Sequence, residues 1–219
     1  MVMQIVKLGS AFFKHILMII LVFMTLNANA RDISTEIKSY ISNIKSIAVE
    51  FTQTDSMNQE FKGMLIIDKP YKFRCNYYEP FPIVIVGNKN YISLYDYEMN
   101  NLSRVKAAEN IFNFLLVDNI DFEKQFQVIS AIEQGENYVI SVKSNDLNKT
   151  SKITFGKKTK HIKQIQIFEE DNIITLEFDK THEINNVANE LFIMKDPDLF
   201  GRAARFNKAD LEKKFNIVR

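Results

Sequence analysis

The chain contains few of the residues from which disulfides, metal sites and most nucleophilic active sites are built. Its 219 residues include one cysteine, Cys75, three histidines and no tryptophan. One cysteine cannot form an internal disulfide, so the fold must depend on packing. Beyond residue 30 there are only His161 and His182, too few for a usual zinc site, and no Gly-x-Ser-x-Gly nucleophile elbow is present. We therefore expect no metal, no cofactor and no enzyme activity.

An excess of charge of one sign is also missing, since 28 basic residues stand against 27 acidic ones. Nucleic-acid binding needs a strongly basic surface, so we expect no nucleic-acid partner. The few glycines form no phosphate-binding loop. What the chain does have is 18 phenylalanines and 8 tyrosines, and such an aromatic load suits β strands around a large apolar interior.

The beginning of the chain has the pattern of a secretory signal peptide. Two lysines precede an uncharged apolar run over residues 16–26, and an Ala-Asn-Ala triplet ends at Ala30. The run is about half as long as the ~20 residues of a membrane-spanning helix. We expect residues 1–30 to be cleaved off after Ala30. Residues 31–219 would then form a single exported domain with a basic C-terminal tail from about residue 201.

Hydrophobic periodicity predicts two helical segments and many strands in the rest of the chain. Apolar residues recur at helical spacing from residue 33 to residue 48 and predict an amphipathic helix. Residues 111–117 are apolar without alternation and predict a short apolar helix. Alternation with a period of two predicts strands over residues 49–53, 61–67, 71–77, 83–86, 91–97, 126–133, 138–143, 151–155, 162–168 and 173–178.

These strands follow one another through hairpin-length polar connections, which predicts an antiparallel sheet. About ten or eleven strands exceed what a flat sheet holds, so we expect the sheet to curl towards a barrel. The apolar helix of residues 111–117 can then plug or cover the curled sheet, with the N-terminal helix beside it. The predicted fold is mainly β (α+β).

Three charged segments could lie at the surface of the fold. Two of them have two possible interpretations, and the third has one. The lysines of residues 157–163 form either a solvated turn or a docking surface for an acidic partner or lipid headgroups. The acidic residues 169–171 are most simply a solvated hairpin tip. Residues 201–219 form either a surface helix or a frayed basic end.

Five segments, in this order, carry a resemblance to one known family. They are the Phe-Thr-Gln motif at residues 51–53, the hairpin at residues 63–74 with its Lys69-Pro70 pair, the turn and hairpin at residues 79–97, the apolar segment at residues 110–116, and residues 191–197. Together they resemble the LolA-type carriers that move outer-membrane lipoproteins through the periplasm. In that family the last two segments correspond to a lid and a closing strand.

The resemblance implies an incomplete β-barrel of about 11 strands whose concave face and helical lid enclose an apolar cavity for acyl chains. The implied lining residues are Phe51, Leu65, Ile67, Phe73, Leu94, Ile111, Phe112, Phe114, Leu115 and Leu116. At any one of these positions, ordinary core packing produces the same pattern. The resemblance further implies a monomeric periplasmic carrier. It would take lipoproteins from an inner-membrane lipoprotein-releasing ABC transporter and pass them to an outer-membrane lipoprotein receptor.

Two positions depart from the family pattern. Lys69 stands where the better-known members carry an arginine that latches the lid, and Cys75 stands where they often carry a large aromatic residue. Lysine keeps the charge but lacks the planar fork of arginine, so Lys69 can hold lid carbonyls only as a point donor. The resemblance therefore predicts a lid that opens more easily and a slightly wider space beside Cys75.

Three other functions compete with the carrier. The outer-membrane receptor of the same fold needs a cysteine as its first mature residue, where this chain has Arg31. A periplasmic lipid- or peptide-binding sensor or adaptor module of the same fold usually brings a second domain. An exported hydrolase would have to use His161 or His182, which are both predicted in polar loops.

Overall fold

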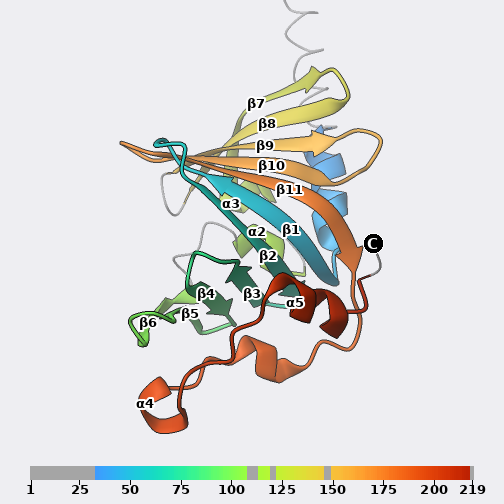
Figure 1. Cartoon of the computed structure of the whole chain (residues 1–219). Helices are drawn as coiled ribbons and strands as arrows, with labels where there is room; N and C mark the ends of the chain where they lie inside the picture. Colours follow the sequence, from blue (N-terminus) through green and yellow to red (C-terminus); the bar gives the residue numbers. More distant parts are fainter. Residues whose placement is uncertain (1–32, 108–112, 119–121, 146–148, 218–219) are drawn as a thin grey trace, which may run out of the picture.

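The structure is a computed structural model that describes residues 33–107, 113–118, 122–145 and 149–217 (Figure 1). The predicted signal peptide and its cleavage site after Ala30 lie outside these ranges, and so do Ile111 and Phe112. Within the ranges described, no helix combines the length and the apolar character needed to cross a bilayer.

Eleven antiparallel strands form one sheet (Figure 1). Along the chain they are β1 (Ser46–Thr54), β2 (Glu60–Asp68), β3 (Lys72–Tyr77), β4 (Ile83–Gly87), β5 (Tyr91–Asp96), β6 (Asn101–Lys106), β7 (Phe126–Gln134), β8 (Asn137–Ser144), β9 (Thr150–Gly156), β10 (Ile162–Phe168) and β11 (Ile173–Glu183). Their order across the sheet is β6-β5-β4-β3-β2-β1-β11-β10-β9-β8-β7. Because β6 and β7 lie at opposite edges, the barrel is incomplete, which confirms the predicted fold class.

Pairing of the first strand with the last one joins two hairpin meanders into this sheet. Phe51 of β1 lies opposite Phe178 of β11, and the register shifts between Val49 and Phe51. On its other side Phe51 lies opposite Gly63 of β2, which in turn lies opposite Tyr77 of β3. Since side chains alternate between the faces of a strand, these residues share the concave face of the sheet.

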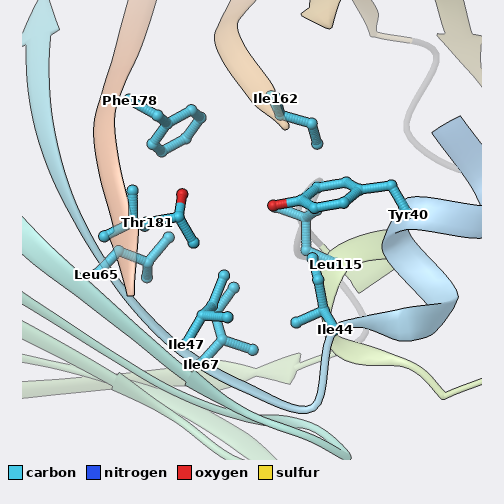
Figure 2. Close-up of a pocket in the computed structure, with 10 residues that line it drawn as sticks. Tyr40, Ile44, Ile47, Leu65, Ile67, Leu115, Ile162, Phe178 and Thr181 are labelled. Atoms are coloured by element: carbon cyan, nitrogen blue, oxygen red, sulfur yellow. The ribbon is translucent and has the colours of Figure 1, made fainter. Parts of the chain in front are cut away.

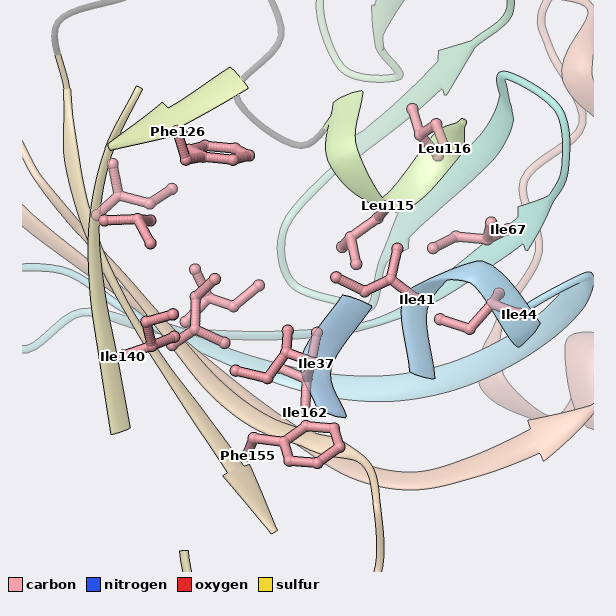
Figure 3. Close-up of a cluster of buried hydrophobic side chains, with 14 of the residues drawn as sticks. Ile37, Ile41, Ile44, Ile67, Leu115, Leu116, Phe126, Ile140, Phe155 and Ile162 are labelled. Atoms are coloured by element: carbon pink, nitrogen blue, oxygen red, sulfur yellow. The ribbon is translucent and has the colours of Figure 1, made fainter. Parts of the chain in front are cut away.

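Short helices cover this concave face (Figures 1 and 3). The described part of the N-terminal helix spans residues 33–43, α2 spans Asn113–Leu116 and α3 spans Phe122–Gln125. Ile37 and Ile41 of the N-terminal helix are fully buried. They belong to one apolar cluster with Leu115 of α2 and with inward side chains of the sheet such as Ile140 and Phe155. This cluster is called the concave core below.

The C-terminal segment covers the opposite, convex face of β2 to β5. It contains the 3-10 helix η2 (Asn189–Phe192) and the helices α4 (Pro197–Phe200) and α5 (Lys208–Lys214). The resulting convex core includes Met64, Ile66, Val84, Val86 and Tyr95 from the sheet and Leu191, Phe192, Met194 and Leu211 from the segment. A capping box of Asn207 and Asp210 begins α5. Of the two interpretations of the tail, residues 208–214 therefore follow the surface helix.

The structure corrects three predictions of secondary structure. The N-terminal helix ends at residue 43 rather than 48, because Ala48 belongs to β1 and is fully buried in the convex core. The predicted closing strand at residues 191–197 is wrong, since η2 and irregular backbone occupy that segment. The edge strand β6 was missed because Leu102 is its only side chain that packs on a core. The extra strand predicted at residues 191–197 offsets the missed β6, so the predicted total of about eleven strands is correct.

Candidate functional site

An apolar cavity of about 260 Å³ lies between the concave face of the sheet and α2. Six residues predicted as lining do line it: Phe51, Leu65, Ile67, Phe73, Leu115 and Leu116. The others are Gln53, Cys75, Tyr77, Ile85, Ile92, Leu176 and Phe178. Within the described part of the chain, no lysine, arginine, histidine, aspartate or glutamate lines the cavity. Such a space favours a hydrocarbon guest.

Two glycines make room for the aromatic rings of this cavity. A Cβ at Gly63 would lie 2.6 Å from Phe51 Cζ, and a Cβ at Gly87 would lie 1.8 Å from Phe73 Cε1. Both distances are shorter than any van der Waals contact, so only glycine lets each ring lie over the neighbouring strand. The Phe51 ring then packs edge-on against Tyr77, with 5.3 Å between the ring centroids.

A second cavity of about 30 Å³ lies beneath the N-terminal helix (Figure 2). It shares four lining residues with the larger cavity, namely Leu65, Ile67, Leu115 and Phe178, so the two spaces adjoin. Its polar groups are the Tyr40 and Thr181 hydroxyls. Burial raises the pKa of Tyr40 to about 12. The concave core is therefore incompletely filled on both sides of Leu115.

The turn between β2 and β3 contacts both helical segments that cover the concave face. Lys69 Nζ donates a hydrogen bond to the backbone carbonyl of Ile41 at 2.5 Å, near the end of the N-terminal helix. The Tyr71 backbone N–H donates to the Leu116 carbonyl at 2.8 Å, at the end of α2. Burial lowers the pKa of Lys69, and the nearby charge of Asp118 opposes this shift. Lys69 thus contacts a helix carbonyl as a single point donor.

A sequence model of the family described as outer membrane lipoprotein carrier protein LolA matches residues 42–195. These residues include the eleven strands of the sheet, α2 and η2. The chain belongs to the LolA family. The resemblance inferred from the sequence motifs is thereby confirmed.

Relatives of this LolA-family chain differ in their sequence identity to it and in the share of each chain that the alignment covers. An uncharacterized protein of Rickettsia prowazekii is 46% identical over 183 residues, which cover 84% of this chain and 86% of the relative. An outer-membrane lipoprotein carrier protein of Chromobacterium violaceum is 28% identical over 140 residues, or 60% of this chain and 68% of the relative. The crystal structure of a LolA superfamily protein from Nitrosomonas europaea aligns with 73% of this chain and 97% of its own, at 7% identity and a TM-score of 0.44.

Four of the predicted lining residues are not placed at the cavity by the structure. Leu94 of β5 lies on the concave face beside Ile92 but is not among the lining residues. Ile111 and Phe112 lie outside the described residues, and Phe114 belongs to α2 without a described side chain. Their role in the LolA-family chain remains the prediction made from the motifs.

Sequence reasoning missed the polar lining residue Gln53 and the backbone contact of Tyr71. Alternation with Phe51 already placed Gln53 on the inward face, and the same signal placed Tyr77 beside Phe73. The polar residues Gln53 and Tyr77 were missed because the family resemblance implied an apolar lining. The Tyr71 contact uses a backbone donor, so no side-chain signal marks it.

The residues most able to act as a base or a nucleophile, His161, His182 and Cys75, lie on different parts of the sheet. His161 is exposed at the turn between β9 and β10, where its ring packs edge-on against Tyr40 with 5.2 Å between centroids. His182 lies in β11 rather than in the predicted loop, opposite Ala48. Burial raises the pKa of Cys75 to about 12, which keeps its thiol neutral and weakly nucleophilic. Within the described residues, no three His, Cys, Asp or Glu side chains form a group that could hold a metal.

The basic run at residues 157–163 finds acidic partners within the LolA-family chain. Lys157 pairs with Glu133 at 2.5 Å, Lys158 pairs with Glu136 at 2.9 Å, and Lys160 pairs with Glu36 of the N-terminal helix. These pairs are at the surface, where each stabilises the fold by little. Both interpretations of the run, solvated turn and docking surface, stay compatible with this arrangement.

Proposed function

We propose that the exported domain is a periplasmic carrier that binds the acyl chains of lipoproteins released from the inner membrane and delivers them to an outer-membrane receptor. The observation that carries this proposal is the apolar cavity between the sheet and α2 in a chain of the LolA family. A lipoprotein-releasing ABC transporter would load the carrier, and the receptor would unload it. The domain itself would work as a monomer after cleavage at Ala30.

The physical need for such a carrier follows from the cost of exposing acyl chains to water. Each methylene that leaves an apolar environment costs about 0.8 kcal/mol, so several long chains oppose transfer by tens of kcal/mol. A carrier offsets this cost only if it replaces the membrane interior with apolar side chains. The concave core supplies such side chains from both halves of the sheet, including Ile67 of β2, Ile140 of β8 and Ile165 of β10.

The cavity is too small for a whole lipoprotein anchor while the lid is closed. A protein cavity of about 150 Å³ holds one benzene molecule, so a space of 260 Å³ holds roughly ten carbon atoms. Cargo binding therefore requires the N-terminal helix and α2 to separate from the sheet. The side chains that now pack against these helices, such as Ile140 and Phe155, would then contact the cargo.

Transfer in one direction follows from the energy of lid opening. A protein that must open before it binds has its affinity reduced by the fraction of open molecules. A receptor with the same apolar surface but a permanently exposed cavity would then bind the cargo more tightly. Opening would break the polar contacts that hold these helices, which include Lys69 to Ile41, Tyr71 to Leu116 and the surface pair of Lys160 with Glu36.

A release assay tests the proposal. Purified residues 31–219 are added to spheroplasts that contain newly made, labelled lipoproteins, and the medium is analysed by size-exclusion chromatography. We expect labelled lipoprotein in a soluble one-to-one complex with the protein. The variant Leu115→Glu should form far less complex, because it places a charge in the cavity wall. The matched control Leu199→Glu should behave as wild type, since Leu199 is 76% exposed in α4.

A second arm removes the dependence on a compatible transporter. A synthetic triacylated lipopeptide is offered directly, and binding is measured by displacement of a neutral apolar dye. Wild-type protein should bind the lipopeptide and Leu115→Glu should not. Failure of the wild type in both arms would overturn the proposal.

A further inference from the structure

The larger cavity has one polar end. Gln53 of β1 and Tyr77 of β3 face it from opposite sides of β2, and Cys75 lies next to Tyr77 on the same face. The Tyr77 hydroxyl donates a hydrogen bond to Gln53 Oε1 at 2.7 Å, across the position of Gly63. The remaining lining residues are apolar. Polar groups are therefore concentrated where β1 approaches its hairpin with β2, away from α2.

The hydrogen bond from Tyr77 leaves half of the Gln53 amide unused. Oε1 accepts from Tyr77, whereas Nε2 has two N–H donors and no hydrogen-bond partner among the described residues. Gln53 Nε2 is not among the fully buried polar atoms without a partner, so this donor keeps accessible surface and is open to an acceptor on a guest.

The charge state of this polar end restricts which guests fit it. The titratable lining groups are Cys75 and Tyr77, and burial raises the pKa of both, so they are neutral at physiological pH. No cationic side chain is found among the described lining residues. A carboxylate placed here would lose its water without gaining a counter-charge. A neutral carbonyl oxygen needs only a hydrogen-bond donor.

We propose that Gln53 is a specificity-determining residue whose Nε2 donates to the carbonyl oxygen of an ester- or amide-linked acyl chain, so that the cavity selects neutral acyl groups over fatty-acid anions. This inference rests on the proposed function, because it concerns the same cavity. The hydrocarbon then runs from Gln53 past Phe51 and Leu65 towards Leu115. The strand distance from Phe61, opposite Gln53, to Ile67 is roughly 20 Å, enough for an extended chain.

Three ligands of similar length test this selectivity. Methyl decanoate has the neutral carbonyl, undecane lacks it, and decanoate at pH 8 replaces it with a charge. Affinities are measured by displacement of the neutral dye N-phenyl-1-naphthylamine from purified residues 31–219. We expect the ester to bind about three- to tenfold more tightly than the alkane, which corresponds to one hydrogen bond. We expect decanoate to bind at least about tenfold more weakly than the ester.

The variant Gln53→Leu removes the donor and keeps the side-chain size. It should bind ester and alkane equally, with the alkane affinity within about twofold of wild type. Gln53→Met provides a second variant without the donor in case leucine prevents folding. The matched control is Gln164→Leu, a strand glutamine whose amide bonds Glu177 away from the cavity, and it should keep the ester preference.

Nuclear magnetic resonance gives a direct readout of the contact. The side-chain NH₂ signals of Gln53 should shift on addition of methyl decanoate and change much less with undecane. An ester preference that survives in both Gln53 variants, or NH₂ signals that respond equally to ester and alkane, would overturn the role of Gln53. Binding of decanoate as tight as that of the ester would overturn it as well. If wild type binds none of the three ligands, the role of Gln53 fails, whereas the carrier function is still decided by the release and lipopeptide assays.

Discussion

The two faces of the same sheet are covered in different ways. On the convex face, Arg74 is buried with 4% of its surface exposed and donates to the carbonyls of Leu191 and Ala204 at 3.1 and 3.5 Å. Arg104 donates to the Met194 carbonyl at 2.6 Å. On the concave face, the helices are held by Lys69, by the Tyr71 backbone and by the surface pair of Lys160 with Glu36, and they leave two adjoining cavities.

The difference shows which cover belongs permanently to the fold. Charge-assisted hydrogen bonds from a buried arginine are strong, and their loss leaves the carbonyl of the buried Leu191 without this partner. The C-terminal segment is therefore a fixed layer of the structure. The short helices on the concave face pack on an incompletely filled core, so we expect fewer contacts to oppose their movement. A space of about 420 Å³ also lies under the C-terminal segment, but charged side chains such as Arg74 and Glu190 line it. The two covers therefore differ in the polarity of the space beneath them, and only the concave cavity is lined without charge.

The largest difference between the two faces should appear when a glutamate is introduced into each core. Val84→Glu places a carboxylate in the convex core, where Val84 is 1% exposed, and should lower the free energy of unfolding by about 4 kcal/mol. Leu115→Glu should cost only about 1 to 2 kcal/mol, because α2 can lift its side chain out of the core. Its binding of acyl ligands should nevertheless be lost. Urea denaturation and dye displacement measure the two effects, and equal destabilisation by both variants would mean that the concave core is as closed as the convex one.

Removal of the arginine that anchors the convex cover should have the next largest effect. Arg74→Met should lower the free energy of unfolding by about 3 kcal/mol, because the hydrogen bonds to Leu191 and Ala204 are lost. Acyl-ligand affinity of the folded fraction should stay unchanged. The control Arg205→Met should cost less than about 0.5 kcal/mol, since its partner Glu79 is largely exposed. A large loss of ligand affinity in Arg74→Met would show that the convex cover takes part in binding.

Substitutions of Lys69 should change the rate of ligand release more than the free energy of unfolding. Lys69→Met removes the hydrogen bond to the Ile41 carbonyl and should speed ligand release about three- to tenfold, at a stability cost below about 1 kcal/mol. Lys69→Arg should slow release, because the guanidinium offers several donors in a fixed fork. Stopped-flow measurement of dye release compares the three proteins. Identical release rates would exclude Lys69 as a latch.

The smallest stability effect is expected at the basic turn. Lys158 has a side chain that is 83% exposed, so Lys158→Ala should change the free energy of unfolding by less than about 0.3 kcal/mol. The informative measurement is transfer of bound lipoprotein to receptor-containing membranes. Unchanged transfer supports a solvated turn, whereas slower transfer at unchanged stability supports a docking surface.

Much of the fold was predictable because its signals are local. Alternation of side chains and polar turns predicted ten of the strands near their observed positions, and also the inward face that carries Phe51, Leu65 and Phe73. Prediction failed where local signals conflict or are weak. Ala48 fits both a helical and a strand pattern, and the pairing of β1 with β11 decides between them. β6 lies at an edge, so most of its side chains face water and give little apolar signal.

By itself the sequence determined ten of the eleven strands, many of the inward side chains and the membership in the LolA family, because periodicity and motif order are properties of neighbouring residues. Only the tertiary structure decided that the C-terminal segment covers the convex face through Arg74, and that Gln53 meets Tyr77 across β2. It also decided that the lid leaves space beneath it. These features join residues far apart in the chain, and their packing depends on the register of the whole sheet.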